Sequence, residues 1–293
     1  MITPQKSYRE LAKAIGVNKL ILKREDLHPY GSHKGRSIPT MIDIYEKQNF
    51  KHFAISSSGN AALAASIYVG KLNTNRKDDK KIKLDILVGR HINSKKLSKL
   101  EQFKSDYIRI TMHDRPLQTL FNLTKDPNVQ ALRQSTDDNA LLGYRSLAEE
   151  LCEIDDIQAV FIGTSSGTTA EALAEYFKDH DRKVEVHVVQ TSSCHPISQA
   201  FVDDNFIEEQ SIADAIVDHS AARKDTILKL LENDGGSGWI ASNEQIRMAQ
   251  ELTEKYAGFK ISTNSALSIA GLIQAVYTGK VWEGSVVCLV CGD

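Results

Sequence analysis

Short hydrophobic runs alternate with segments of helical periodicity along most of this chain. The strand-like runs are Lys19–Lys23, Lys51–Ile55, Leu84–Val88, Ala159–Ile162, Val184–Val189 and Val286–Val290. The helical segments are Asn60–Tyr68, Ser94–Phe103, Leu141–Cys152, Thr169–Phe177, Ser242–Tyr256 and Ser265–Tyr277. Parallel strands need a crossover connection, which is usually a helix, so the alternation favours parallel sheets covered by helices. The sequence therefore predicts an α/β fold, and 293 residues suffice for one large or two medium domains.

Two of the expected helices begin with recognisable capping residues. Ser242 is followed three residues later by Gln245, which is the spacing of a capping box. Ser94 precedes a segment in which Leu100 and Phe103 recur at helical spacing, so we expect that helix to begin at Ser94.

The charge balance argues against nucleic acid or an anionic membrane surface as a partner. Lys and Arg number 36 and Asp and Glu number 38, so the net charge is only −2. No stretch approaches the roughly 18 consecutive apolar residues of a membrane span, and Met1–Lys6 lacks the apolar run of a signal peptide. Four scattered cysteines are typical of a reducing compartment. We therefore expect a cytoplasmic protein that binds neither nucleic acid nor membrane.

Cys288 and Cys291 have the spacing of a redox or metal motif, but they close a Val-rich, strand-like run. Residues three apart on a strand point to opposite faces, so a shared metal ion or a disulfide is disfavoured there. We expect no metal site.

Three clusters of small residues follow predicted strands and open predicted helices. They are Tyr30–Gly35, Ser56–Asn60 and Gly163–Thr169. Ligands of parallel sheets collect at the carboxyl ends of the strands, and a helix N-terminus there favours an anion. The third cluster is the richest in hydroxyl groups and suits a phosphate best. Each cluster alone is equally compatible with an ordinary turn, and the fingerprints G-x-G-x-x-G, G-x-x-x-x-G-K-[ST] and H-E-x-x-H are absent.

Lys34 follows Gly31, Ser32 and His33 at a predicted strand-to-helix junction. It is compatible with an ordinary surface lysine. A partly desolvated amine near a phosphate-binding loop can instead form a Schiff base with an aldehyde. Spacing alone leaves both interpretations open.

A family resemblance bears on this choice. The segment Leu22–Lys34 resembles the lysine motif of the fold type II enzymes that use pyridoxal 5′-phosphate (PLP), a group that includes threonine synthase, the cysteine synthases, the serine/threonine dehydratases and the β subunit of tryptophan synthase. Ser57–Ala62 resembles the S-G-N loop of this family, and Gly163–Thr169 is similar to its phosphate loop, with fewer glycines than usual. In the second half, Gly143–Glu150, Gln190–Phe201, Ile212–Ile216 and Asn264–Leu272 resemble the threonine synthase branch.

The resemblance implies a role for each matching residue. Lys34 would carry the Schiff base and shuttle protons, and Asn60 would hydrogen-bond the ring oxygen of the cofactor. Cys291 stands where the family places a Ser or Thr beside the pyridine nitrogen, and a neutral partner there leaves that nitrogen largely unprotonated. The implied substrate-carboxylate residues are Ser57, Ser58 and Gly59, and the implied phosphate-binding residues are Ser165, Ser166, Gly167, Thr168 and Thr169.

The resemblance also implies the architecture and the activity. We expect a two-domain fold type II PLP enzyme with parallel-rich, twisted sheets covered by helices. Residues 36–142 would form a smaller inserted α/β domain, and residues 1–35 and 143–293 would form a larger PLP-binding domain. The expected activity is that of a lyase that acts on an amino acid through an external aldimine, converting O-phosphohomoserine to threonine. We expect a homodimer, as is common among relatives.

Departures from the family pattern keep other activities open. His33 and Gly35 replace the Phe and Asp usual around the lysine, Ser262–Thr263 replaces a Glu-Pro pair, and the chain ends at Gly292–Asp293, where relatives continue. The alternatives are a serine/threonine dehydratase, a β-replacement enzyme similar to cysteine synthase, and a non-catalytic protein that keeps the fold and binds a ligand. A nucleotide-binding α/β protein is disfavoured by the missing fingerprints.

Overall fold

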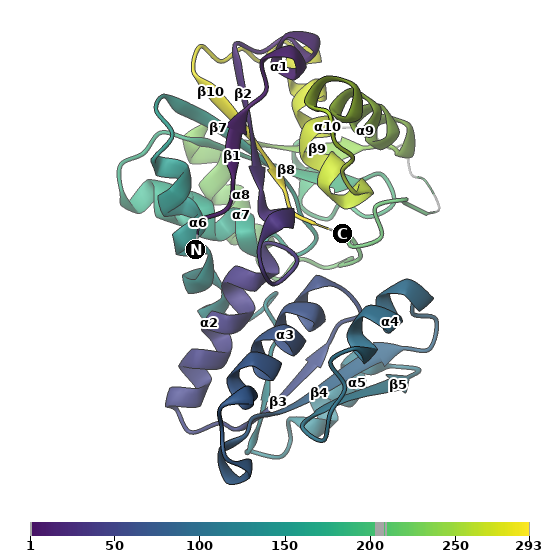
Figure 1. The fold of residues 1–293 in the computed structure, drawn as a ribbon. Coiled ribbons are helices and arrows are strands. Elements are labelled where there is room, and N and C mark those ends of the chain that lie inside the picture. The colour runs from purple at the N-terminus through teal and green to yellow at the C-terminus, as the bar shows by residue number, and fades with distance from the viewer. Residues whose placement is uncertain (1, 203–207, 209, 293) are drawn as a thin grey trace. The chain divides into compact units, whose positions relative to one another are not determined.

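The computed structural model describes residues 2–202, 208 and 210–292. The chain divides into two compact units, a larger one of Met1–Leu27 with Tyr144–Asp293 and a smaller one of His28–Gly143 (Figure 1). The smaller unit therefore begins at His28 and not at residue 36, which places Lys34 in the smaller unit, whereas the sequence had indicated the larger one. The reason is local: the turn before Lys34 packs against a helix of the smaller unit, as described below.

The larger unit is built on a six-stranded sheet. Its strands, in the order in which they lie in the sheet, are β1 (Gln5–Ser7), β2 (Lys19–Arg24), β10 (Ser285–Val290), β7 (Ile157–Gly163), β8 (Glu185–Thr191) and β9 (Ser237–Ala241). All neighbours are parallel except β1 and β2, which run antiparallel. Because β10 is inserted between β2 and β7, the last strand of the chain lies at the centre of this sheet.

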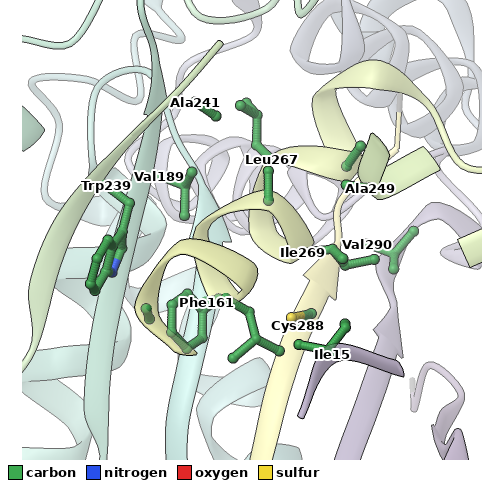
Figure 2. Close-up of a cluster of buried hydrophobic side chains, with 14 of the residues drawn as sticks. Ile15, Phe161, Val189, Trp239, Ala241, Ala249, Leu267, Ile269, Cys288 and Val290 are labelled. Atoms are coloured by element: carbon green, nitrogen blue, oxygen red, sulfur yellow. The ribbon is translucent and has the colours of Figure 1, made fainter. Parts of the chain in front are cut away.

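Helices cover both faces of the larger sheet. They are α1 (Arg9–Ile15), α7 (Thr168–Asp179), α8 (Lys224–Asp234), α9 (Asn243–Ala257), α10 (Thr263–Tyr277) and the greater part of α6 (Asn139–Cys152). Helices α1, α9 and α10 share one hydrophobic core with the sheet. Figure 2 shows part of this core, where Ile269 of α10 lies near Val290 of β10. Because helices bury both faces of this sheet, the sequences of β7, β8 and β10 contain continuous hydrophobic runs.

The smaller unit has a four-stranded, fully parallel sheet. Its order is β5 (Ile108–His113), β4 (Lys83–Gly89), β3 (His52–Ser56) and β6 (Val129–Ala131). Its helices are α2 (Lys34–Lys47), α3 (Asn60–Thr74), α4 (Ser94–Glu101) and α5 (Pro116–Leu123). Side chains of β4 alternate in the way a pleated strand requires, with Leu84, Ile86 and Val88 in the core shared with α2 and α3 and Leu87 in the core shared with α5. The prediction of an α/β fold with parallel-rich sheets covered by helices is therefore confirmed.

Every strand and helix expected from the sequence is present, with ends that differ by a few residues. The helix expected to open at Lys34 is α2, and the elements not anticipated are β1, β5, β6, β9, α1, α5 and α8. Most of these are short or lie at sheet edges. Strand β5, for example, is an edge strand whose residues Arg109, Thr111 and Met112 are exposed, so it lacks the hydrophobic run of a central strand.

Both predicted helix starts are observed. The capping box of Ser242 and Gln245 is confirmed, because each side chain hydrogen-bonds the backbone N–H of the other residue. The start of α4 at Ser94 is confirmed as well, but the residue that caps this helix is the one before Ser94. The cap is Asn93, whose side-chain oxygen accepts from the backbone N–H of Lys95 at 2.9 Å, and an amide oxygen caps a helix as well as a hydroxyl does. Among the described residues, no helix combines the length and the hydrophobicity that crossing a membrane requires.

Candidate active site

Lys34 is the first residue of α2 and is partly exposed. A tight turn leads into it, in which the backbone N–H of Gly31 donates to the carbonyl of His28 at 2.7 Å. Gly31 has a φ of +84°, a conformation that disfavours residues with a Cβ atom. The backbone N–H of Lys34 donates to the Ser32 hydroxyl at 3.3 Å, so the turn continues directly into the helix. The amine of Lys34 is thus carried on the first turn of a helix and not on a loose loop.

The Ser57–Asn60 segment lies between the end of β3 and the start of α3, and all four residues are partly exposed. The Ser57 hydroxyl accepts from the backbone N–H of Gly59 at 3.3 Å. A Cβ atom on Gly59 would meet nothing within 4 Å, so open space lies beside its backbone. Asn60 opens α3, and the first N–H groups of a helix have no acceptor within the helix. The segment is therefore suited to receive a small anion such as a carboxylate.

The lysine turn and the Ser57–Asn60 segment are held in the same unit by the packing of α2 on α3. Leu63 and Tyr68 of α3 supply the contacts. A Cβ atom on Gly31 would lie 3.1 Å from Leu63 Cδ2, and the rings of Tyr30 and Tyr68 meet edge to face with centroids 5.8 Å apart. The predicted amine and the predicted carboxylate-binding segment thus share one rigid framework.

The Gly163–Thr169 segment connects β7 to α7 in the larger unit. The backbone N–H of Thr164 donates to the carbonyl of Val189 at 3.0 Å, and its hydroxyl accepts from the N–H of Gly167 at 3.1 Å. Gly167 has a φ of +83°, and a Cβ atom there would lie 2.1 Å from Ile227 Cδ1, so a side chain would clash. The segment therefore forms a fixed turn before the N-terminus of α7, where the helix dipole favours an anion.

The hydroxyl-bearing residues of this turn are placed differently. Ser166 and Thr168 are buried, and their hydroxyl oxygens lie 2.9 Å apart. Thr169 is buried as well. The Ser165 hydroxyl is engaged within the protein, because it accepts from the backbone N–H groups of Val217 and Asp218 at 3.0 Å each and donates to the Asp218 carboxylate at 3.1 Å. Ser165 therefore ties the turn to the chain at residues 217–218.

Gln190 fixes the same turn from the neighbouring strand. It is fully buried, and its side-chain amide donates to the carbonyl of Ser165 at 3.0 Å. Its side-chain oxygen accepts from the backbone N–H groups of Ile197 and Ser198 at 2.8 and 2.9 Å. Sequence reasoning gave Gln190 no role. The available signal was a long polar side chain directly after the apolar pair Val188 and Val189.

Cys291 lies at the same edge of the larger sheet. In the register of β10 with β7, Cys288 pairs with Phe161, so Cys291 comes level with the beginning of the Thr164–Gly167 turn. Cys291 is buried, and the next residue is held on both sides by α10. The Ser262 hydroxyl donates to the carbonyl of Gly292 at 2.7 Å, and the N–H of Gly292 donates to the Ser265 hydroxyl at 3.0 Å. The side chain of Cys291 is thus held at the sheet edge where the turn before α7 begins.

Ser262 was noted in the sequence only as a departure from the family pattern. It is the N-cap of α10, where its hydroxyl accepts from the backbone N–H of Ser265 at 3.1 Å. The same hydroxyl donates to Gly292, so one side chain connects α10 to the segment that carries Cys291. The signal in the sequence was the Ser-x-x-Ser spacing of a helix cap.

The groups present suit the chemistry of PLP. The smaller unit offers a partly exposed amine on a helix start, and the larger unit offers the N-terminus of α7 with the thiol of Cys291 at the same sheet edge. The amine can react with the aldehyde of PLP. The start of α7 can bind its phosphate, and the side chain at the same sheet edge can contact its pyridine nitrogen. Among the described residues, no group of His, Cys, Asp and Glu side chains is placed to hold a metal ion.

Comparison with known proteins agrees with this assessment. A family model described as pyridoxal-phosphate dependent enzyme matches residues 2–292. The threonine synthase of a Bacillus species is 26% identical over 297 residues, which span 98% of this chain and 81% of that protein. The structure of maize serine racemase matches with a TM-score of 0.83 at 16% identity, over 99% of this chain and 87% of that chain. A pyridoxal 5′-phosphate-dependent aspartate racemase matches with a TM-score of 0.81 at 18% identity, over 100% and 90% of the two chains. The structural matches show a shared fold of type II, and the family match shows that this chain belongs to the pyridoxal-phosphate dependent enzymes, with pyridoxal 5′-phosphate as its cofactor.

Proposed function

We propose that this enzyme is a lyase of the threonine synthase type, which converts O-phosphohomoserine and water to threonine and phosphate. One observation carries the proposal: a protein named threonine synthase aligns with 98% of this chain, and further relatives with the same name align with 99% of it. The segments that resemble this branch include Gln190 and Asn264, and both side chains organise the carboxyl edge of the larger sheet.

Each residue of the site has a proposed task. When bound, PLP supplies the delocalisation that stabilises a carbanion next to the substrate nitrogen. Lys34 holds the cofactor and moves protons at the carbon atoms of the substrate. Asn60 hydrogen-bonds the ring oxygen, and Ser57, Ser58 and Gly59 bind the substrate carboxylate.

The phosphate of the cofactor is assigned to the turn before α7. Ser166, Gly167, Thr168 and Thr169 hold it through backbone N–H groups and hydroxyls at the positive end of the helix dipole. Ser165 contributes its backbone, since its hydroxyl is used in binding residues 217–218.

Cys291 is proposed to face the pyridine nitrogen. A thiol is a weak hydrogen-bond partner and carries no charge when protonated, so it does not favour protonation of that nitrogen. An unprotonated ring withdraws electrons less strongly, which suits elimination and replacement at the β and γ carbons.

Product analysis tests the reaction. We expect the PLP-loaded enzyme to release inorganic phosphate and threonine from O-phosphohomoserine in equal amounts, and to form no 2-oxoacid from serine or threonine. Formation of 2-oxoacid without phosphate release would replace the proposal with a dehydratase. Product formation from serine and an added nucleophile would indicate a β-replacement enzyme. A loaded protein without turnover on any of these substrates would indicate a binding protein that keeps the fold.

The role of Lys34 is tested by absorption spectroscopy. Wild type and Lys34→Ala are incubated with PLP and desalted, and their visible spectra are recorded. We expect the band of lysine-bound cofactor in wild type and its loss in the variant, because a secondary contact cannot replace the covalent link. Thermal melts of both proteins without cofactor provide the control for folding. A band that survives in Lys34→Ala would contradict the assignment.

A further inference from the structure

The side chain of His28 occupies the space into which any side chain at position 35 would project. A Cβ atom on Gly35 would lie 2.3 Å from His28 Nδ1, 2.5 Å from His28 Cε1 and 2.7 Å from Tyr30 Cβ. Real Cβ contacts are essentially never this short. The imidazole is therefore seated directly against the backbone of α2, one residue after Lys34. Gly35 replaces the Asp usual in the family, and the contact explains why no larger residue fits here.

His28 also organises the turn that leads to Lys34. Its carbonyl accepts from the backbone N–H of Gly31 at 2.7 Å, and its ring nitrogen Nδ1 accepts from the backbone N–H of Tyr30 at 3.2 Å. Nδ1 is therefore the unprotonated nitrogen of the ring. His28 is 7% exposed, so its side chain is buried.

The turn is fixed on its other side by α3. Tyr30 lies between His28 and Tyr68, with ring centroids 5.4 and 5.8 Å away. Gly31 packs against Leu63 of the same helix. A turn held by α3 on one side and by the His28 imidazole on the other leaves Lys34 a single position at the start of α2.

We propose that His28 is a positioning residue for Lys34, which acts through the Nδ1 acceptor and through the contact of its ring with Gly35. The inference rests on the role proposed for Lys34 above. The hydrogen bond sets the path of Tyr30 and Gly31, and the ring contact sets the start of α2, so together they determine where the amine is presented. Displacement of a reacting group by about 1 Å lowers rates by about 100-fold, so such support has a large effect.

Three variants separate the two contributions of His28. In His28→Asn, the side-chain oxygen is separated from Cα by the same number of bonds as Nδ1 of histidine. It can therefore accept from the backbone N–H of Tyr30, as in an Asx turn. His28→Leu keeps apolar volume against Gly35 but has no acceptor. His28→Ala removes both contributions. His91→Ala, a change of an exposed histidine in the same unit, is the matched control.

Two readouts are taken on full-length protein. Hydrogen exchange of the protein without cofactor is followed by mass spectrometry over residues 28–36. The dissociation constant for PLP and the visible band at saturating PLP are then measured. We expect faster exchange and about tenfold weaker PLP binding in His28→Leu and a larger loss in His28→Ala, because the partly buried N–H of Tyr30 loses its acceptor. His91→Ala is expected to match wild type within about threefold, and His28→Asn is expected to lie between wild type and His28→Leu, because it keeps the acceptor but lacks the ring contact with Gly35.

The results distinguish this inference from the proposals above. Wild-type exchange and wild-type PLP affinity in His28→Ala would overturn it, and so would a His28→Asn variant as impaired as His28→Leu. If the circular dichroism of His28→Ala shows that this variant does not fold, the inference is tested by the exchange and PLP affinity of His28→Asn compared with those of His28→Leu. The Lys34→Ala spectrum is recorded in parallel: a surviving band there refutes the role of Lys34, whereas the exchange readout tests His28 without cofactor or substrate.

Discussion

At the scale of single residues, two glycines in helices of the smaller unit show how environment decides what a residue does. Gly35 in the first turn of α2 meets His28 and Tyr30, whereas a Cβ atom on Gly70 in α3 would meet nothing within 4 Å. Neither has a positive φ, so backbone strain plays no part at either position. The difference between them is purely one of packing.

We predict opposite effects of alanine at these two positions. Gly35→Ala should lower the free energy of unfolding by about 1–3 kcal/mol, because the new methyl group displaces packed atoms. Gly70→Ala should raise it by about 0.5–1 kcal/mol, because alanine loses less backbone entropy in a helix. Urea denaturation of both variants, each without cofactor, measures the two values. Equal stability of the two variants would show that His28 and Tyr30 move aside without cost.

At the scale of secondary-structure elements, β8 carries a histidine into the core of the larger unit. His187 is fully buried, and its ring stacks on Phe161 with centroids 4.3 Å apart. The Trp239 indole donates to Nδ1 at 3.2 Å, so the proton of the neutral ring is on Nε2 and is donated to Glu185 at 3.0 Å. Burial lowers the pKa of His187, and the hydrogen bond to Glu185 offsets this only in part.

The direction of this shift predicts an acid-sensitive stability. The folded protein keeps His187 neutral, while the unfolded chain binds a proton near its ordinary pKa of about 6.5. The contribution of buried, neutral His187 to the free energy of unfolding is therefore fully present above about pH 6.5. Below that pH it decreases, by at most about 1.4 kcal/mol per pH unit. Melting temperatures measured from pH 8 to pH 5 should fall more steeply in wild type than in His187→Gln, whose amide keeps a donor and an acceptor but does not titrate. Parallel curves would contradict this.

Strand β2 buries a lysine that α6 neutralises. Lys23 is fully buried, forms an ion pair with Glu150 and donates to the carbonyl of Thr3 at 3.0 Å. Burial of a charge costs desolvation free energy, and an ion-pair partner offsets that cost. By contrast, the ion pair of Lys260 and Glu254 is largely exposed.

Neutralising the two acids should therefore have very different effects. Glu150→Gln should lower the free energy of unfolding by about 3 kcal/mol, since it removes the negative charge that Glu150 places beside a buried ammonium group. Glu254→Gln, the matched control in the same unit, should change it by less than about 1 kcal/mol. Chemical denaturation of the two variants beside wild type gives both numbers. A loss below 1 kcal/mol in Glu150→Gln would mean that Lys23 gives up its proton at little cost.

At the scale of the whole molecule, the proposed cofactor contacts come from both units. Lys34 and Asn60 belong to the smaller unit, and the turn before α7 and Cys291 belong to the larger one. A ligand that binds only the folded state stabilises it by mass action, by about 2.7 kcal/mol at 100 times its dissociation constant.

Calorimetry tests whether both units contribute. With excess PLP, we expect the unfolding of both units to shift to higher temperature, by about 5–10 °C for chains of this size. Lys34→Ala should lose most of the shift. A transition of one unit that stays in place with PLP, while the other moves, would show that all contacts with the cofactor lie in a single unit.

Much of this protein was evident in the sequence, because the responsible signals are local. The central strands β7, β8 and β10 are buried along nearly their whole length, so their hydrophobic runs predict them directly. The capping box of Ser242 is a property of four consecutive residues. The clusters around Lys34, Asn60 and Gly167 could be singled out because each places small residues before a helix, whereas the roles expected of them came from the family resemblance.

The tertiary structure decided what depends on residues far apart in the chain. The position of β10 between β2 and β7 follows from the pairing of whole strands, and no local pattern encodes it. The Ser165 hydroxyl was expected to face a phosphate, yet residues 217–218 engage it. The contact of the His28 ring with Gly35 could not be predicted from the sequence either. Periodicity and composition report which residues are buried or helical, whereas the partner of a buried polar group is set only when the folded chain brings distant segments into contact.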